Sequence, residues 1–417
     1  MQLKRVVVTG IGAITPIGNT AREYWESLLL GKSGAAPITL FDASKFKTQF
    51  ACEIKNFDFE KFFDRKEIRK LDRYSQLGII SATEAVEDSK ILEGEVDRDR
   101  IGVIWASGIG GIQSFHNEVE GFVTGDGSPK YNPFFIPKMI SDIATGHISI
   151  KYGFHGPNFA TVSACASSAN ALADAYNYIR LGKADAFVSG GSEAAITVDG
   201  VGGFNAMHAI STRNDDPTTA SRPFDKDRDG FVIGEGGGAL IFEELEHALA
   251  RGAKIYAEVA GAGLSGDGYH VTAPHPEGYG AYLCMKAAVE DAEMNLTDID
   301  HINTHGTSTP VGDIVEPKAI VKLFGDHAYN ININSTKSMT GHLLGGTGAV
   351  EAIATLLAVK NDIVPPTINH FNDDPEIDSR LNFTFGKAVE RKINAALSNT
   401  FGFGGHNASI IFKKFTK

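Results

Sequence analysis

The chain has 417 residues, of which 42% are hydrophobic and 22% are charged. This composition excludes a disordered or fibrous protein. The length predicts roughly two or three globular units. With 39 basic against 51 acidic residues, the net charge is −12, which argues against a nucleic-acid-binding protein because such proteins present basic surfaces.

Short strand-like runs alternate with alanine-rich helical stretches along the chain. Strands are predicted at residues 4–9, 101–105, 184–188, 254–259, 331–334 and 408–412, and helices at 166–181, 281–292 and 349–359. This alternation is typical of an α/β fold with covered sheets. The best boundary lies in residues 243–254, where a charged helix precedes a new strand, so we predict halves of 1–253 and 254–417.

Each half contains a similar motif, in which a strand-like run leads through a turn of small residues into a helix. Residues 161–165 precede the first such helix, and residues 331–342 precede the one that ends near Lys360. This weak echo indicates a duplicated fold with a reactive side chain at a helix N-terminus in each half.

The cysteine content and the apolar runs bear on the compartment. Cys52, Cys165 and Cys284 are too few for a disulfide framework and favour a reducing environment. The first apolar run ends at Thr9-Gly10, too early for a secretory signal. The sequence has no run of about 18 apolar residues, so no membrane span is expected. We therefore expect a cytoplasmic protein.

Three familiar motifs are present only in part. Residues 261–266 match GxGxxG, but a loop with two prolines follows where a dinucleotide site requires a helix. Residues 225–230 copy the first half of a calcium loop, yet its twelfth position is Gly236 instead of glutamate. His301 and His305 have no evident third ligand. We expect neither a bound cofactor nor a metal.

Cys165 lies where a strand-like run meets a helix. The positive end of a helix dipole lowers the pKa of a thiol there and favours the nucleophilic thiolate. Taken alone, Cys165 is better explained as a small buried residue than as a nucleophile. Cys52 and Cys284 keep that interpretation.

Two histidines and a glycine-hinged turn change the balance. His305 and His342 lie among glycines and threonines, which leave space for a ligand to approach each imidazole. Near the chain end, residues 402–405 read Gly-Phe-Gly-Gly, a segment able to move as a lid.

The set of Cys165, His305, Lys337, His342 and residues 402–405 resembles the β-ketoacyl-acyl carrier protein synthases of the thiolase superfamily, above all the type II condensing enzymes of fatty acid synthesis. The resemblance extends over nearly the whole chain and includes GIGG at 108–111, NPFF at 132–135, SRPFD at 221–225 and STKSMTGH at 335–342. It implies a thiolase-like duplicated fold of five layers, α-β-α-β-α, in a homodimer without a resident cofactor.

The resemblance also implies catalytic roles. Cys165 would take an acyl chain from acyl carrier protein as a thioester, and malonyl-acyl carrier protein would lose CO₂ and attack it. His305 and His342 would stabilise the negative charge that develops, with His305 also assisting loss of CO₂. Lys337 would hold His342, supported by Glu351.

Further residues would bind the substrate or the carrier. Phe403 would gate the site, and its backbone N–H would form an oxyanion hole with that of Cys165. The resemblance assigns substrate binding to Thr307, Thr309, Ile109, Phe401 and Phe135, and carrier docking to Lys66, Arg69 and Lys70. Ordinary core packing is the alternative for Ile109, and a solvated helix face is the alternative for the basic cluster.

Other functions stay open on the sequence alone. A ketosynthase of a specialised polyene or polyketide pathway shares every catalytic residue. A non-catalytic partner subunit that binds acyl carrier protein predicts that Cys165 is never acylated. Ser163 and Ser168 depart from the usual family residues beside the nucleophile and leave the acyl preference undetermined.

Overall fold

Ten strands form one mixed sheet in the computed structural model, which describes residues 3–416. Its order is β10-β9-β13-β14-β8-β1-β7-β6-β4-β5. The first half of the chain supplies β1 (Val6–Ile14), β4 (Ile101–Ala106), β5 (Asn158–Thr161), β6 (Ala186–Glu193) and β7 (Gly236–Glu244). The second half supplies β8 (Ala257–Gly266), β9 (His301–Asn303), β10 (Asn332–Asn334), β13 (Ala395–Gly402) and β14 (His406–Lys413).

The two sets of five strands share one topology. The order β1-β7-β6-β4-β5 in the first set corresponds to β8-β14-β13-β9-β10 in the second. In both sets the first three strands pair antiparallel and the last three pair parallel. Antiparallel pairing between β1 and β8 joins the sets into one sheet. The predicted duplication is therefore confirmed. The chain passes from one set to the other between α10 (Leu245–Ala250) and β8, and the division at residue 253 stays a prediction.

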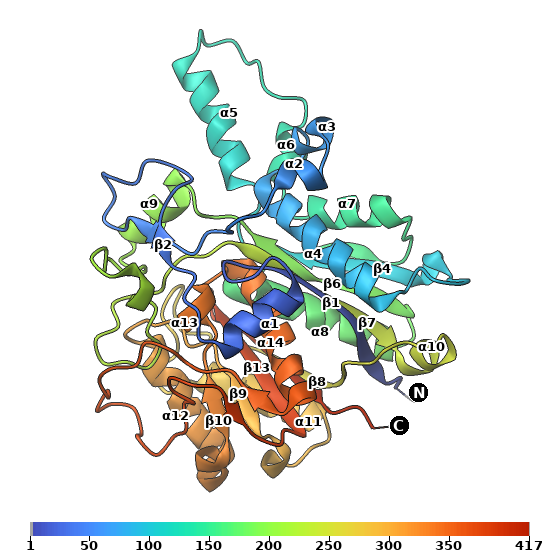
Figure 1. The fold of residues 1–417 in the computed structure, drawn as a ribbon, viewed down its shortest axis with the longest axis vertical. Coiled ribbons are helices and arrows are strands. Elements are labelled where there is room, and N and C mark those ends of the chain that lie inside the picture. The colour runs from blue at the N-terminus through green and yellow to red at the C-terminus, as the bar shows by residue number, and fades with distance from the viewer. Residues whose placement is uncertain (1–2, 417) are drawn as a thin grey trace.

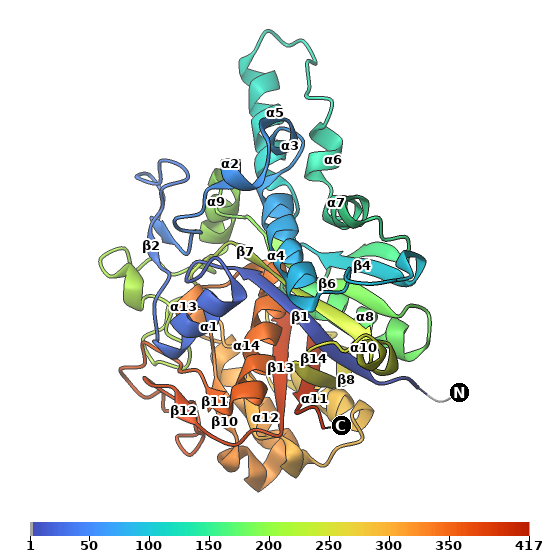
Figure 2. The same ribbon diagram turned by 45° about the vertical axis from the view of Figure 1, so that its right-hand side comes forward.

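Helices complete the five predicted layers (Figures 1 and 2). At the centre, α8 (Ser167–Arg180) and α14 (Thr347–Asn361) contact strands of both halves. On the outside, α4 (Arg73–Ser89) and α7 (Ile143–Tyr152) cover the first half, while α11 (Tyr279–Asp291) covers the second and packs on α12 (Gly312–Phe324). Residues 347–359 of α14 are all buried, which explains why most of this segment is apolar.

Shorter elements surround this frame. The remaining helices are α1 (Ala21–Leu29), α2 (Phe59–Phe62), α3 (Arg65–Ile68), α5 (Ile112–Thr124), α6 (Phe135–Met139), α9 (Val198–Ala206) and α13 (Lys337–Thr340). Two small antiparallel pairs join β2 (Ala36–Pro37) to β3 (Phe50–Ala51) and β11 (Ile363–Val364) to β12 (Val389–Glu390). In Figure 2, α5 projects from the top of the molecule. Among residues 3–416, no helix is long and apolar enough to cross a membrane.

The glycine-rich segment 261–266 differs from its prediction. It lies inside β8, whereas the predicted strand ended at residue 259. A Cβ on Gly261 or Gly263 would lie 2.5 or 2.1 Å from a backbone carbonyl oxygen of α11. These glycines therefore allow a helix to pack closely on a strand, which is why the pattern mimics a dinucleotide motif without being one.

Candidate active site

Cys165 lies in a 3₁₀ turn, η2 (Ala164–Ala166), directly before α8. The predicted strand ends earlier, at Thr161. Ala164 has a φ of +50°, a strained value for a residue with a side chain. A Cβ on Gly402 of β13 would lie only 2.7 Å from the carbonyl oxygen of Ser163. Glycine at this position therefore allows β13 to pass close to the turn that carries the nucleophile.

The second half builds an equivalent turn. Another 3₁₀ turn, η6 (Leu344–Gly346), leads into α14, and Leu344 has a φ of +45°. His342 lies just before this turn and is 2% exposed. The two central helices thus start at matching turns that bring Cys165 and His342 together.

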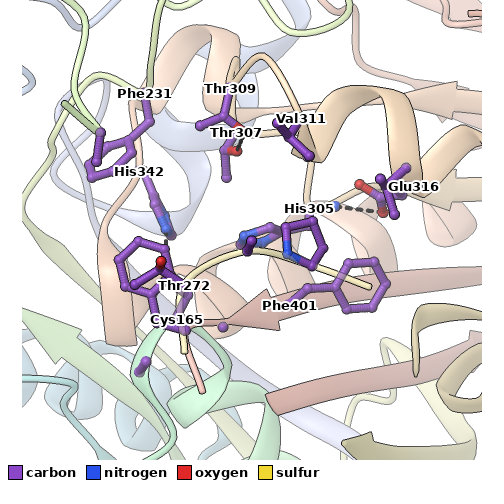
Figure 3. A pocket seen from close by; sticks show the side chains of 18 of the residues that line it. Cys165, Phe231, Thr272, His305, Thr307, Thr309, Val311, Glu316, His342 and Phe401 are labelled. Carbon is purple, nitrogen blue, oxygen red and sulfur yellow. Dashed lines mark hydrogen bonds between the residues drawn. The ribbon is translucent and has the colours of Figure 1, made fainter. Parts of the chain in front are cut away.

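Cys165, His305 and His342 converge as the sequence predicted (Figure 3). The Sγ atom of Cys165 lies 3.1 Å from Nε2 of His342, across 177 residues of sequence. The rings of His305 and His342 are 5.4 Å apart between centroids, at an angle of 84°. One ligand atom from each of the three residues lies within 4.8 Å of the other two.

Thr347 holds the imidazole of His342. Its Oγ1 lies 2.9 Å from Nδ1 of His342, a role that we expected of Lys337. Because a hydroxyl group both donates and accepts, Thr347 supports either tautomer of the ring. Nε2 of His342 can therefore accept a proton from Cys165 at one stage and donate a hydrogen bond at another.

Lys337 instead forms a buried ion pair with Glu351. Its Nζ lies 2.7 and 2.8 Å from the two carboxylate oxygens, and both side chains are 1% exposed. Burial raises the pKa of Glu351 to about 7, and the Lys337 charge opposes this shift. A pair with this geometry keeps a positive charge close to the two imidazoles.

Both active-site imidazoles are neutral at physiological pH. Burial, together with the charge of Lys337, holds the pKa of His342 well below its ordinary value. The same two causes and the neighbouring His342 hold the pKa of His305 well below that value. Neutral rings suit hydrogen-bond donation to a developing oxyanion and, at His342, proton acceptance from a thiol.

The pKa of Cys165 runs against the sequence expectation. Burial raises the pKa of the thiol to about 11, where the helix position predicted a lowered one. The backbone N–H groups of Phe403 and of Cys165 itself, with the charge of Lys337, oppose the rise. At rest Cys165 is therefore a thiol, and its proton must leave for the sulfur to attack.

A cavity of about 500 Å³ opens beside the three residues. Predicted substrate-binding residues line it: Ile109, Thr307, Thr309, Phe401 and the gate residue Phe403. Phe204 and Phe231 add to its apolar wall, which suits an acyl chain. The hydroxyl oxygens of Thr307 and Thr309 lie 3.0 Å apart.

Phe135 is not among the residues that line this cavity within one chain. It begins α6 and stacks on Tyr131 at 5.6 Å between ring centroids. Phe115 lies 6.3 Å away on the projecting α5. Within one chain, Phe135 therefore belongs to an aromatic cluster beside α5, and its predicted role in substrate binding stays a prediction.

The Gly-Phe-Gly-Gly segment forms the turn between β13 and β14. Gly404 and Gly405 have φ values of +87° and +74°, which glycine adopts freely. The Gly404 N–H donates to the Val271 carbonyl at 2.6 Å, and the Asp267 N–H donates to the Gly405 carbonyl at 2.9 Å. This turn is thus tied to the loop after β8 at the cavity wall.

Sequence reasoning missed two buried carboxylates that hold the site. Glu316 on α12 accepts the N–H groups of His305 and Gly306, both at 2.9 Å, and burial raises its pKa to about 7. Glu193 at the end of β6 accepts the N–H groups of Gly108 (2.7 Å) and Gly345 (3.0 Å). A lone carboxylate among small and apolar residues is the signal that could have found Glu193, whereas Glu316 has Asp313 and Lys318 nearby in sequence.

The predicted docking cluster lies on the surface. Lys66 belongs to α3, and Arg69 and Lys70 follow that helix directly; all three are exposed. Nζ of Lys70 lies 5.5 Å from the ring centroid of Phe134, and none of the three takes part in the cavity wall. The cluster is therefore free to meet an acidic partner.

Cys165, His305 and His342 are also the only group of three metal-ligating side chains found close together in residues 3–416. Zinc accepts such a ligand set. The ammonium group of Lys337, however, acts electrostatically on both imidazoles and repels a second cation. Nucleophile and hydrogen-bond donors therefore explain this arrangement better than metal ligands do.

Family comparison identifies the chain. The β-ketoacyl synthase N-terminal domain matches residues 3–248, and the corresponding C-terminal domain matches residues 256–371. The chain belongs to the β-ketoacyl synthase family. This synthase is 49% identical over 415 residues to a 3-oxoacyl-[acyl-carrier-protein] synthase 2 of Synechocystis, covering 100% of this chain and 99% of the relative. It is equally identical to the Staphylococcus aureus (strain COL) protein of the same name, over 99% of both chains.

Solved structures support the same assignment. A β-ketoacyl synthase from Burkholderia phymatum superposes with a TM-score of 0.91 at 34% identity, covering 99% of this chain and 100% of the other. A type II polyketide ketosynthase in complex with its acyl-carrier protein gives a TM-score of 0.88 at 31% identity, over 100% of both chains. These likenesses confirm the predicted thiolase-like fold class.

Proposed function

We propose that this β-ketoacyl synthase is a 3-oxoacyl-acyl carrier protein synthase of type II fatty acid elongation, an acyltransferase. The contact of 3.1 Å between Cys165 and His342, at an apolar cavity shared with His305, carries the proposal. Full-length identity of 49% to the 3-oxoacyl-[acyl-carrier-protein] synthase 2 of Synechocystis, against 31% to the polyketide ketosynthase, favours elongation over a specialised pathway.

The first half-reaction acylates Cys165. Nε2 of His342 takes the thiol proton as the sulfur attacks the thioester carbonyl of acyl-acyl carrier protein. The backbone N–H groups of Cys165 and Phe403 stabilise the oxyanion, as their approach to the sulfur suggests. The carbon–sulfur bond to the phosphopantetheine arm then breaks, and the leaving thiolate takes the proton from His342.

The second half-reaction forms the carbon–carbon bond. Malonyl-acyl carrier protein loses CO₂, and the electron pair of the broken bond moves onto its thioester oxygen. His305 and His342 donate hydrogen bonds to this enolate oxygen. The enolate carbon attacks the acyl-Cys165 thioester, whose carbon–sulfur bond then breaks. This step releases a 3-oxoacyl carrier two carbons longer and the Cys165 thiolate, which takes up a proton from solvent. Phosphopantetheine arrives on the carrier, so the reaction needs no resident cofactor.

Partners and location follow from the same reasoning. Lys66, Arg69 and Lys70 would dock the acyl carrier protein on an otherwise acidic chain. We expect a homodimer, as the sequence resemblance implies. All three cysteines are free, in agreement with a cytoplasmic location.

Intact mass spectrometry tests this function. The protein is mixed with a medium-chain acyl-acyl carrier protein and then with malonyl-acyl carrier protein. We expect an acyl adduct on Cys165, followed by a 3-oxoacyl carrier two carbons longer. No adduct at all would contradict the nucleophile assignment and favour a non-catalytic subunit.

A further inference from the structure

The segment that imitates a calcium loop, Asp225–Gly230, lies against the cavity wall and has no role in the chemistry above. Its turn is held without metal, because Asp225 accepts the N–H groups of Phe371 (2.6 Å), Asn372 (2.8 Å) and Asp227 (2.9 Å). The role of Arg228, in the middle of this turn, is not explained by those contacts, although its side chain is only 2% exposed.

Arg228 points its guanidinium at the loop that carries Thr307 and Thr309. Nε donates to the Thr309 carbonyl at 2.9 Å, and one terminal nitrogen donates to the Pro310 carbonyl at 2.8 Å. The other terminal nitrogen donates to the Asp225 carbonyl and to the Asp374 carboxylate, both at 2.7 Å. The planar fork therefore joins two segments about 80 residues apart in the chain.

Three consecutive carbonyls of the threonine loop are satisfied from this one turn. Besides the two carbonyls bound by Arg228, the Ser308 carbonyl accepts the Gly230 N–H at 3.1 Å. On the opposite side, Asp313 accepts the N–H of Ser308 at 3.1 Å and that of Thr309 at 3.4 Å. Ser308 has a φ of +68°, a conformation that needs such support.

The consequence concerns what the loop offers to a ligand. Its backbone groups from Ser308 to Pro310 are occupied by protein, so the hydroxyl groups of Thr307 and Thr309 are its available polar groups at the cavity. A fixed backbone places both hydroxyls where an amide-bearing substrate arm can bond to them.

We propose that Arg228 is a positioning residue that orders the Thr307–Thr309 loop for the phosphopantetheine arm. It acts on recognition of the arm, while the reactivity of Cys165 is independent of it. The inference rests on the proposed function, since it presumes an acyl donor that carries this arm.

The experiment compares three reactions of Cys165, each followed by intact mass. The first is acylation by acyl-acyl carrier protein, the second is acylation by a thiophenyl thioester of the same acyl chain, which lacks the arm, and the third is alkylation by iodoacetamide. The test variant is Arg228→Lys. Its matched control is Arg222→Lys, because the Arg222 side chain is similarly buried but contacts Thr219, Asp225 and Phe371 and not the threonine loop.

We expect Arg228→Lys to slow acylation by acyl-acyl carrier protein about tenfold or more, since small misplacements of binding groups cost about this much or more. The other two reactions should stay within about twofold of the wild type. Arg222→Lys should leave all three reactions unchanged. Asp374→Asn, which keeps Arg228 but removes its carboxylate partner, should show a weaker form of the same pattern even if Arg228→Lys folds poorly.

Equal slowing of all three reactions by Arg228→Lys would overturn the proposal, because it would indicate general damage to the site. Unchanged acylation by acyl-acyl carrier protein, or the same defect in Arg222→Lys, would overturn it as well. Failure of the wild type to accept an acyl chain from the carrier would instead contradict the proposed function and is distinguishable from all of these results.

Discussion

The two halves of the molecule share a topology and a turn but differ in what they place there. In the first half, the turn before α8 reads Ala164-Cys165-Ala166; in the second, the turn before α14 reads Leu344-Gly345-Gly346. Gly345 thus takes the place of the nucleophile and donates its N–H to Glu193 of the first half. The duplicated scaffold thus provides two equivalent positions: one holds the nucleophile, and the other holds a glycine that makes a structural contact.

The halves also differ in protonation. The first half buries a thiol whose pKa rises to about 11, whereas the second half buries two imidazoles whose pKa values fall well below the ordinary value. Burial disfavours the charged form in each case and therefore moves the acid and the bases in opposite directions. The proton must cross between the halves at the contact of Cys165 with His342.

Removing the thiol should have the largest effect. Cys165→Ala takes away the nucleophile of the first half, so we expect condensation to fall by about 10⁶-fold. The measurement is formation of 3-oxoacyl-acyl carrier protein by mass spectrometry. Cys284→Ser, which changes a buried cysteine that bonds only Gly263 and Ser409, is the control and should remain active.

Removing an imidazole of the second half should separate the two half-reactions. His305→Ala loses one of two donors to the enolate, and we expect condensation to fall by about 10²–10³-fold. Acylation of Cys165 should persist, because His342 and not His305 contacts the sulfur. Rapid quenching followed by intact mass measures both steps, and an equal loss of both would show that the halves do not divide the chemistry.

The structural turn of the second half should not accept a side chain. A Cβ on Gly345 would lie 2.2 Å from the backbone nitrogen of Gly108 and 2.8 Å from Oε2 of Glu193. We expect Gly345→Ala to lower the free energy of unfolding by about 3 kcal/mol, measured by chemical denaturation. Gly146→Ala is the control, because that glycine lies in α7 with open space around its missing Cβ; equal stability of the two variants would contradict the packing argument.

The smallest expected effect is a pH dependence. Because the folded pKa of Cys165 is about 11, the thiolate fraction rises as pH rises toward that value. Alkylation of Cys165 by iodoacetamide should therefore accelerate about tenfold per pH unit over the neutral and mildly alkaline range. Measured rates that level off near neutral pH would instead indicate the lowered pKa that the helix position alone predicts.

Much of this site could be predicted from the sequence. Cys165, His305 and His342 lie in contexts that resemble those of the β-ketoacyl synthases, and this resemblance predicted that they act together. Strand and helix positions followed from apolar runs with clear boundaries. The strand predicted at residues 254–259 spans Ala257–Gly266 instead, and its glycines allow α11 to pack closely on it.

The remaining features depend on contacts between distant segments. The bond from Thr347 to His342 is set by packing that local pattern does not encode. The same holds for the pKa of Cys165, since the helix position is visible in the sequence but the depth of burial is not. The support of Lys337 by Glu351, in contrast, was expected from the sequence resemblance.

The most direct test of the division between the halves is CO₂ release from malonyl-acyl carrier protein by Cys165→Ala. We expect this variant still to decarboxylate the malonyl group, because His305 and His342 are intact, while His305→Ala should lose most of that activity. Loss of CO₂ release in Cys165→Ala to the same extent as condensation would contradict this division of roles.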